Sequence, residues 1–285
     1  MEVLNPSPVL ALPKTMWLAW EVAGKRTDLT EAELINLIRP ESLRGTAPQQ
    51  GAHAARAVAC LKELRLLVSD SEGILNAEGQ GGLQYFTERL RRAVTIDPAS
   101  VGGEYQGAPD LRAGLSWLLE QSPMEPLHWE ENVQDLTTPE VLKNDTRWNG
   151  FRTWATFLGF GRIATSLHTS GRGDRLLSNP FDAVHAALRA AVKSGERLGS
   201  PIPFGHLLTA MHDELPVFLR RDIGKAEGPN VVAPGIAYGF LGLEHRGILT
   251  LQRQSDSAGA IGLPDPFDSK VIRYVSSATI DGSLK

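Results

Sequence analysis

The chain has 285 residues, of which 42% are apolar and 22% are charged, and its formal net charge is −4. At roughly 100–150 residues for a domain, this length predicts about two domains or three small ones, and the apolar fraction excludes a globally disordered chain. The negative net charge excludes a uniformly cationic nucleic-acid coat. No run approaches the ~18 apolar residues of a membrane-spanning helix, and no secretory signal is expected.

Helical spacing of apolar residues begins early in the chain. Leu12-Pro13 opens a first helix, because proline is accepted in a first helical turn, and Gly24 ends it. Thr30, followed three residues later by Glu33, forms a capping box at the start of a second helix. Pro40 stops that helix.

A third helix is predicted at about 51–65, with its apolar residues on one side. Two short strands follow at 66–68 and 74–75, on either side of a polar turn at 69–73. Three short helices followed by a small β-hairpin are typical of a winged helix-turn-helix unit.

A similar order recurs in the middle of the chain. Residues 147–163 predict a helix that ends at Leu-Gly and continues into an apolar run. A glycine-rich turn at 170–174 then leads into Leu176-Leu177. The ranges 82–94 and 109–122 supply the helices before it.

The last hundred residues repeat the order once more. Helices are predicted at 184–192, 204–215 and 233–244. A strand at 248–251 and a turn at 255–259 lead to Ile261, which we expect to form a wing. The alternating run Val271–Val275 predicts one further strand.

Together these patterns predict a mainly α-helical protein with small β-hairpin wings, built as tandem winged helix-turn-helix units. Residues 1–80 form the first unit. A helical linker and a second helix–wing unit occupy 81–180, and a C-terminal winged-helix unit occupies 181–285.

The charge is unevenly distributed in the middle of the chain. Residues 120–140 carry six Asp and Glu residues without one Lys or Arg, whereas residues 141–180 carry six Lys and Arg residues against two Asp. One interpretation is a solvated face beside an intramolecular partner of opposite sign. The other is that these segments select binding partners.

Only the middle unit has the charges that a DNA-binding winged helix needs. Such a unit places its third helix in the major groove, where Arg and Asn read base edges, and its wing on the phosphate backbone. In the first unit His53, Arg56, Lys62 and Arg65 precede an acidic wing. The last unit offers only His245, Arg246 and Arg253. The predicted nucleic-acid-binding residues are therefore Arg147, Asn149, Arg152, Arg162, Arg172 and Arg175. Trp148 and Trp154 have two interpretations: they are stacking surfaces, or at least one belongs to the core, because residues six apart do not share one face of a regular helix.

The residues that would indicate an enzyme do not occur at the required spacings. The seven histidines include no i,i+4 pair that would share a metal ion, and the single cysteine, Cys60, excludes a sulfur-rich zinc site. Cys60 lies in the apolar pattern of the third helix and is interpreted as a buried small hydrophobe, and a lone cysteine is typical of a reducing cytoplasm. We predict no catalytic residue, no metal and no cofactor.

Val3-Leu4-Asn5-Pro6, the nearby Leu12-Pro13 and the two terminal winged-helix patterns resemble the DpdG proteins. These are encoded in bacterial clusters that install 7-deazaguanine derivatives in DNA and restrict unmodified DNA. The resemblance implies a cytoplasmic accessory component of the restriction side. It supplies no catalytic residue.

These observations predict a non-catalytic DNA-binding or adaptor subunit of a bacterial phage-defence complex. Its partners would be double-stranded DNA and other subunits of the complex, without a membrane. One alternative is a free-standing winged-helix transcriptional regulator, which requires base-edge donors on the 51–65 helix and a palindromic site. Another is an enzyme with a dispersed site, which requires a deep pocket that holds titratable groups.

Overall fold

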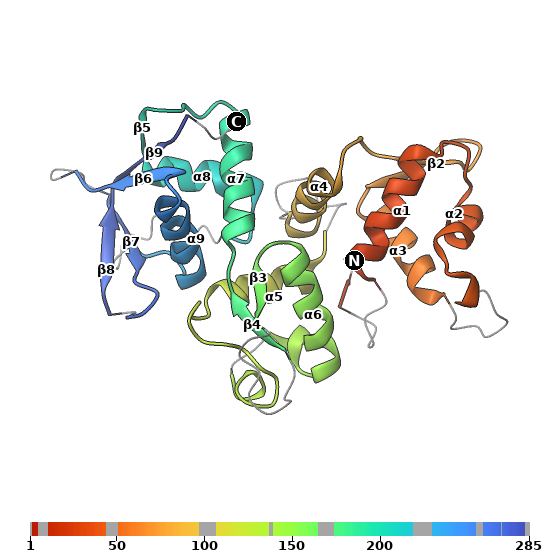
Figure 1. Cartoon of the computed structure of the whole chain (residues 1–285), viewed down its shortest axis with the longest axis horizontal. Coiled ribbons are helices and arrows are strands. Elements are labelled where there is room, and N and C mark those ends of the chain that lie inside the picture. Colours follow the sequence, from red (N-terminus) through yellow and green to blue (C-terminus); the bar gives the residue numbers. More distant parts are fainter. Residues whose placement is uncertain are drawn as a thin grey trace. The chain divides into compact units, whose positions relative to one another are not determined.

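The computed structural model in Figure 1 describes residues 2–4, 11–43, 51–96, 107–136, 139–164, 174–218, 230–254, 259–268 and 270–282. The chain forms two compact units. Unit 1 comprises residues 1–113 and 139–158, and unit 2 comprises residues 114–138 and 159–285. Short antiparallel strands accompany the helices throughout, so the fold is mainly α with small β-sheets. The division at residues 80 and 180 stays a prediction.

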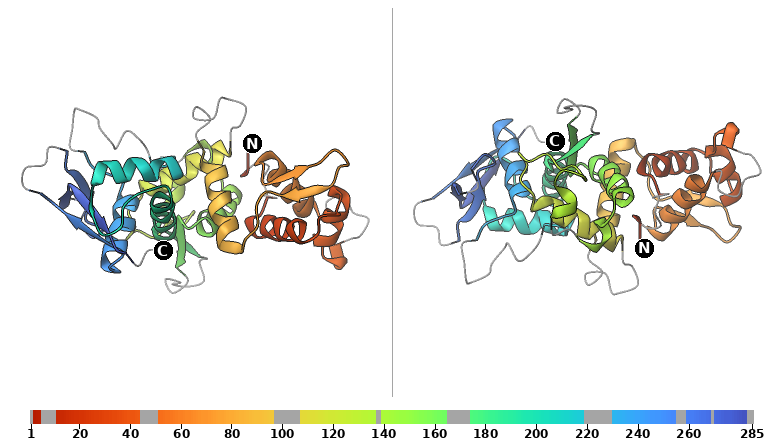
Figure 2. Two further views of the ribbon diagram at one scale, coloured as in Figure 1. Left: turned by 90° about the horizontal axis from the view of Figure 1, so that it is seen from above. Right: turned by 90° about the horizontal axis from the view of Figure 1, so that it is seen from below.

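Unit 1 begins with the predicted helices and hairpin. Its elements are α1 (Pro13–Lys25), α2 (Glu31–Ile38), α3 (Ala52–Glu63), β1 (Leu67–Ser69) and β2 (Leu75–Ala77). A short 3-10 helix follows α2 at Glu41–Leu43. The strands pair antiparallel, and Figure 2 shows the orange hairpin beside the red helix α1. The elements predicted for this part of the chain are confirmed within one or two residues.

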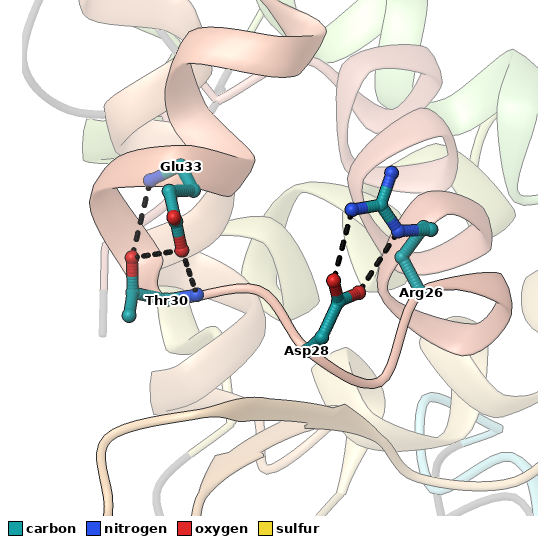
Figure 3. Close-up of polar contacts among 4 residues, drawn as sticks. All are labelled: Arg26, Asp28, Thr30 and Glu33. Carbon is teal, nitrogen blue, oxygen red and sulfur yellow. Dashed lines mark hydrogen bonds and ion pairs between the residues drawn. The ribbon is translucent and has the colours of Figure 1, made fainter.

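The start of α2 has the capping geometry that the sequence predicts (Figure 3). The Glu33 backbone N–H donates to Thr30 Oγ1 at 3.4 Å, and the Glu33 carboxylate accepts from the Thr30 N–H at 2.9 Å. Two backbone donors at the helix start are thereby satisfied. Just before them, Arg26 and Asp28 form an ion pair at 2.8 Å across the loop that joins α1 to α2.

The rest of unit 1 packs around aromatic side chains. Helix α4 (Leu83–Thr95) places Phe86 against Trp17 and Trp20, with ring centroids 5.4 Å apart in both pairs. Helix α6 (Asp145–Phe157) contributes Phe157, 6.4 Å from Phe86 in an edge arrangement. Aromatic pairs in these geometries add to the free energy of apolar burial.

The N-terminal segment is fixed to α5 (Pro109–Leu119) by one buried carboxylate. Asp110 accepts the backbone N–H groups of Val3 at 2.7 Å and of Leu4 at 2.6 Å. It also accepts the N–H of Leu111 at 2.8 Å. Burial raises the pKa of the Asp110 carboxyl, and the three N–H groups oppose that rise. The side chains of Val3 and Leu4 are buried as a result.

Unit 2 contains a hairpin of β3 (Gly161–Ala164) and β4 (Arg175–Ser178), which pair antiparallel. These are the predicted apolar runs on either side of the glycine-rich turn, of which 170–173 lie outside the described residues. Two short 3-10 helices precede α6 in the chain, at Val133–Asp135 in unit 2 and at Glu140–Leu142 in unit 1.

The C-terminal part of unit 2 combines helices with two small sheets. Its helices are α7 (Phe181–Lys193), α8 (Phe204–Glu214) and α9 (Pro234–His245). Its strands are β5 (Pro201–Pro203), β6 (Leu249–Gln252), β7 (Ile261–Pro264), β8 (Ile272–Val275) and β9 (Ser277–Ile280). One sheet has the order β5-β9-β6, and the other is the hairpin β7-β8. The three helices and the strand at 271–275 are confirmed.

The predicted wing between 248–251 and Ile261 is wrong. Strand β6 pairs with β9 in the register Leu249–Ile280 to Gln252–Ser277, and β7 pairs with β8 instead. The β7–β8 hairpin is therefore an insertion between the two paired strands β6 and β9. The prediction was wrong because it paired the strand at 248–251 with the nearest following apolar run, which belongs to the inserted hairpin.

A strand contact recurs at the same place in three parts of the chain. A residue that follows a helix forms an isolated bridge with a residue of the next hairpin: Thr30 with Ile74, just before β2, and Leu127 with Leu176 of β4. Between α7 and α8 this position is occupied by the whole strand β5, which pairs with β9. Along the chain Leu127 follows α5, as Thr30 follows α1 and β5 follows α7.

Helix α9 packs closely on α7 through glycines. A Cβ added at Gly239 would lie 2.6 Å from a methyl group of Val184, a contact that real Cβ atoms do not make. Val184 is a β-branched residue in a helix and cannot turn away. By contrast, a Cβ at Gly205 in α8 would meet its nearest atom at an ordinary 3.6 Å.

This difference predicts opposite effects for two identical substitutions. Gly239→Ala is expected to lower the free energy of unfolding by about 1–2 kcal/mol, because overpacking outweighs the higher helix propensity of alanine. Gly205→Ala is expected to raise it by up to about 1 kcal/mol. Urea denaturation of both variants followed by circular dichroism measures the two changes, and equal effects would contradict the packing argument.

An ion pair fixes β8 against α9 and β6. Arg273 donates to both carboxylate oxygens of Glu244, at 2.5 and 2.8 Å, and to the Leu251 carbonyl oxygen at 2.8 Å. The Leu251 N–H donates to Glu244 at 3.0 Å. Burial acts to raise the pKa of Glu244, but the hydrogen bonds from Arg273 and Leu251 outweigh it, so the pKa lies below its ordinary value.

Glu244→Gln is expected to destabilise the protein at neutral pH but not in acid. Because the pKa of Glu244 is lower in the folded protein, its ionised carboxylate stabilises the fold at pH values above its ordinary pKa of 4.5. This stabilisation is lost as the pH falls through the folded-state pKa. Solvent screening of this half-exposed pair limits the effect to about 1 kcal/mol. Denaturation at several pH values should show the wild-type and variant stabilities converging below this range, and a difference that persists in acid would contradict the assignment.

Candidate nucleic-acid interface

Helix α6 is the element that carries most of the predicted site. The Asn144 side chain accepts the Arg147 N–H at 2.8 Å and caps its start. Gly159, with φ of +78°, allows the chain to leave the helix. Its inner face is apolar, and the side chains buried there are Trp148, Phe151, Trp154 and Ala155.

The opposite face of α6 carries a polar stripe. Asn149, Arg152, Thr153 and Thr156 follow the spacing i, i+3, i+4 and i+7, which places them on one side of a helix. Asn149, Thr153 and Thr156 are exposed, and Arg152 is half-buried. Arg152 donates to the Asn149 amide oxygen at 2.5 Å. The guanidinium is thereby oriented by a neighbour that is itself a hydrogen-bonding group.

The predicted binding residues fall in both units. Arg147, Asn149 and Arg152 share α6 in unit 1, with Arg147 half-buried. Arg162 is exposed on β3, and Arg175 lies on β4, both in unit 2. Arg172 lies outside the described residues. The structure therefore brings three of the six predicted residues together on one helix.

The Arg175 guanidinium is held within unit 2 by the acidic segment. Its two terminal nitrogens meet the Glu131 carboxylate at 2.5 and 2.7 Å, and the side chains are only 16% and 26% exposed. The neighbouring Leu127 and Leu176 exchange backbone hydrogen bonds at 2.8 and 2.9 Å. At this position the acidic and basic segments are intramolecular partners, and phosphate binding by Arg175 would first require breaking the pair.

The tryptophans of α6 are not stacking surfaces. Trp148 is 2% exposed and Trp154 is fully buried. The Trp154 indole N–H donates to the Ala11 carbonyl oxygen at 2.9 Å, which fixes the chain before α1 to α6. Both rings belong to the core of unit 1, so the interpretation of Trp148 and Trp154 as base-stacking surfaces is wrong.

The cations of α3 are engaged by neighbouring acceptors. Arg56 donates to the Glu2 carbonyl oxygen at 2.8 Å and meets Glu63 at 3.2 Å. Lys62 forms an ion pair with Glu31 of α2 at 2.5 Å. Binding of a phosphate by Arg56 or Lys62 would first require breaking these contacts.

Helix α9 is mostly buried and presents few polar groups. Its buried face packs through Gly235 and Gly239. Just beyond its end, the Arg246 guanidinium lies 4.0 Å from the centroid of the Phe181 ring. Arg246 therefore forms a cation–π interaction with Phe181 within unit 2.

Thr153 and Thr156 were missed by the sequence analysis. The signal was available, because they follow Asn149 at four and seven residues, the spacing of one helical face. The two threonines were not predicted because the candidate residues were chosen mainly by positive charge, although hydroxyl groups also bind phosphates and base edges.

The described residues offer few groups for other kinds of site. Within the described ranges, no cluster of three or more His, Cys, Asp or Glu side chains has the arrangement to hold a metal ion. Cys60 is buried, and burial raises the pKa of its thiol to about 11, so the thiolate is disfavoured at neutral pH. In the part of the chain that is described, no helix has the length and hydropathy to cross a membrane.

The comparisons with known proteins assign the chain to a family. The comparisons with curated proteins and with solved structures give no match. A model of the DpdG-like family matches residues 1–257, which confirms the resemblance to that family. The chain belongs to the DpdG-like family.

Proposed function

We propose that the chain is a non-catalytic DNA-binding or adaptor subunit of a bacterial phage-defence complex that restricts DNA. Membership of the DpdG-like family associates the chain with the Dpd modification system. In the proposal, α6 contacts double-stranded DNA and other surfaces of the chain contact further subunits. The protein works in the cytoplasm, in the setting of 7-deazaguanine DNA modification.

The recurring strand contact supports tandem winged-helix units. In a winged helix, a strand between the first and second helices completes the sheet of the wing. The contacts Thr30–Ile74, Leu127–Leu176 and β5–β9 each occupy that position. In the proposal, the order of elements along the chain gives the 3-10 helices at 133–135 and 140–142 the role of a second helix and α6 the role of a recognition helix.

The observation that carries the proposal is the polar stripe of α6, which consists of Asn149, Arg152, Thr153 and Thr156. Arg and Asn are the side chains that read guanine and adenine edges by paired hydrogen bonds, and threonine hydroxyl groups bind phosphates. Arg162, exposed on β3 of unit 2, is a further proposed phosphate contact that is independent of the stripe on α6.

The transcriptional-regulator alternative has less support. It requires base-edge donors on α3, where Arg56 and Lys62 are engaged by Glu2, Glu63 and Glu31. A regulator also selects one palindromic site, whereas the proposed subunit binds duplexes of random sequence.

The experiment that tests the proposal is a fluorescence anisotropy titration of the full chain against a random-sequence duplex over a series of salt concentrations. With Arg147 and Arg152 of α6 at the phosphates, the logarithm of the binding constant should fall with the logarithm of salt concentration with a slope of about −2. Kd values in the micromolar range are expected at low salt. Absence of binding at low salt would overturn the DNA-binding part of the proposal.

A further inference from the structure

The outer face of the β3–β4 hairpin in unit 2 carries two arginines. Leu176 and Ser178 of β4 are buried, so the alternation of side chains along a strand puts Arg175 on the opposite face. Arg162 of β3 pairs with Leu177, which lies on the same face as Arg175. Cross-strand partners share one face of a sheet. Arg162 and Arg175 are therefore diagonal neighbours on the outer face of this hairpin.

The two arginines differ in what they contact. Arg162 is exposed. Arg175 places each of its terminal nitrogens against a different oxygen of the Glu131 carboxylate, at 2.5 and 2.7 Å. Arginine binds carboxylates and phosphates in the same two-pronged geometry. The Glu131 carboxylate therefore takes the position on Arg175 that a phosphate group would need.

Glu131 belongs to an ordered loop at residues 126–135, called here the acidic loop. Leu127 exchanges backbone hydrogen bonds with β4 at 2.8 and 2.9 Å, and its side chain is buried. The Asn132 side chain accepts the His128 N–H at 2.9 Å and donates to the Pro126 carbonyl oxygen at 2.9 Å. Because the loop is already fixed beside β4, the ion pair of Glu131 costs less conformational freedom than a pair between two mobile side chains.

We propose that Glu131 is a built-in competitor that withholds Arg175 from the phosphates of a nucleic acid, and that a phosphate takes its place when the ion pair opens. The inference rests on the proposed function, because it concerns a second contact with the same duplex. Arg162 is accessible to a phosphate in either state, whereas Arg175 contributes only after its release. The acidic loop thereby limits the affinity of the protein for nucleic acid.

Other charged groups lie close to this pair in the chain. The acidic loop and the described part of the hairpin also contain Glu130, Asp135, Asp174 and Arg162. These groups act on a phosphate through space whether or not Arg175 is paired, and their effect is screened by salt. Comparison of a change at Glu131 with the same change at Glu130 therefore separates the ion pair from the general charge of the loop.

The test is a fluorescence anisotropy titration of full-chain variants against a random-sequence duplex over a series of salt concentrations. The variants are Glu131→Gln, Glu131→Asp, Arg175→Gln and the double variant with both glutamines. Glu130→Gln is the matched control, because it removes the same charge from the neighbouring, exposed residue of the loop. Circular dichroism checks that every variant is folded.

Glu131→Gln should bind the duplex about 5-fold more tightly than the wild type at low salt, the factor that corresponds to a competing ion pair of this exposure. Its salt dependence should be steeper by about 0.9, the value for one further phosphate contact. Glu131→Asp, which keeps the charge but shortens its reach, should show a smaller gain. Arg175→Gln alone should change the affinity by less than about 2-fold, because its guanidinium is already occupied, and the double variant should lose the gain. Glu130→Gln should leave the slope unchanged.

Three results would overturn this inference and leave DNA binding by α6 in place. They are an unchanged affinity and slope of Glu131→Gln, an equal gain in Glu130→Gln, and a loss of affinity in Arg175→Gln alone as large as the expected gain. Binding by Glu131→Gln without binding by the wild type would support the inference and contradict contact through α6. Absence of duplex binding by both proteins at low salt would overturn the inference together with the proposed function.

Discussion

Arg152→Glu is expected to weaken binding of the full chain to a random-sequence duplex by about 30-fold at low salt. The substitution removes a cation from the polar stripe of α6 and puts a carboxylate beside the phosphates. It also ends the hydrogen bond from Arg152 to Asn149. A well-placed arginine contact is worth about 1–3 kcal/mol, and repulsion adds to its loss. Fluorescence anisotropy at fixed salt measures the change.

Lys14→Glu is the matched control for this experiment. Lys14 is exposed in the first turn of α1 in the same unit, so its reversal changes the net charge by the same amount. A glutamate near a helix N-terminus is also favourable to the helix dipole. If both variants lose affinity equally, the effect comes from net charge and α6 is not the contact surface. An unchanged affinity of Arg152→Glu, with the fold intact, would also contradict the assignment.

Asp110→Ala is expected to lower the free energy of unfolding by about 3 kcal/mol. The substitution leaves the backbone N–H groups of Val3, Leu4 and Leu111 without their acceptor, and a buried donor without a partner costs about 1–3 kcal/mol. Release of Val3 and Leu4 would limit this cost but would expose two buried apolar side chains. Urea denaturation measures the stability, and limited proteolysis should cut the N-terminal segment faster in the variant.

Asp182→Ala provides the comparison for Asp110→Ala. Both aspartates are second residues of helices, but Asp182 in α7 is exposed. Its loss removes only a favourable charge near a helix N-terminus, worth about 0.3–1 kcal/mol. If Asp110→Ala destabilises the protein no more than Asp182→Ala does, the buried carboxylate does not fix the N-terminal segment.

The elements of the first unit were predictable because their signals are local. Pro13 at a helix start, the Thr30–Glu33 capping box and the turn at 69–73 each act within a few residues, and each has the predicted geometry. Helix periodicity likewise placed α4 to α9 within a few residues.

The pairing of the C-terminal strands depends on distant residues. β5 contains Pro201 and Pro203, which argue against a strand in the sequence, although edge strands accept proline. Its partner β9 lies at the end of the chain, beyond the inserted β7–β8 hairpin. No local pattern links Pro201–Pro203 to Ser277–Ile280, so the sequence analysis joined β6 to the nearest apolar run instead.

In the candidate site, too, the features set by local sequence were predictable and those set by distant contacts were not. That α6 is a helix with polar positions follows from its sequence, but which of its cations face neighbouring groups does not. The Glu131–Arg175 pair joins residues far apart in the chain, and the burial of Trp154 depends on the Ala11 carbonyl oxygen. A prediction from composition includes such arginines and tryptophans among the DNA-binding residues, because it does not show their contacts within the protein.

The measurement that tests the DNA-binding role most directly is site-specific photocrosslinking to a random-sequence duplex. A photoreactive phenylalanine is placed at Thr153 on α6 or at Ala55 on α3, and both positions are exposed. Contact through α6 predicts a crosslink to DNA from position 153 and none from position 55. A crosslink from position 55 alone, equal crosslinks from both positions, or no crosslink from position 153 while the duplex is bound would contradict it.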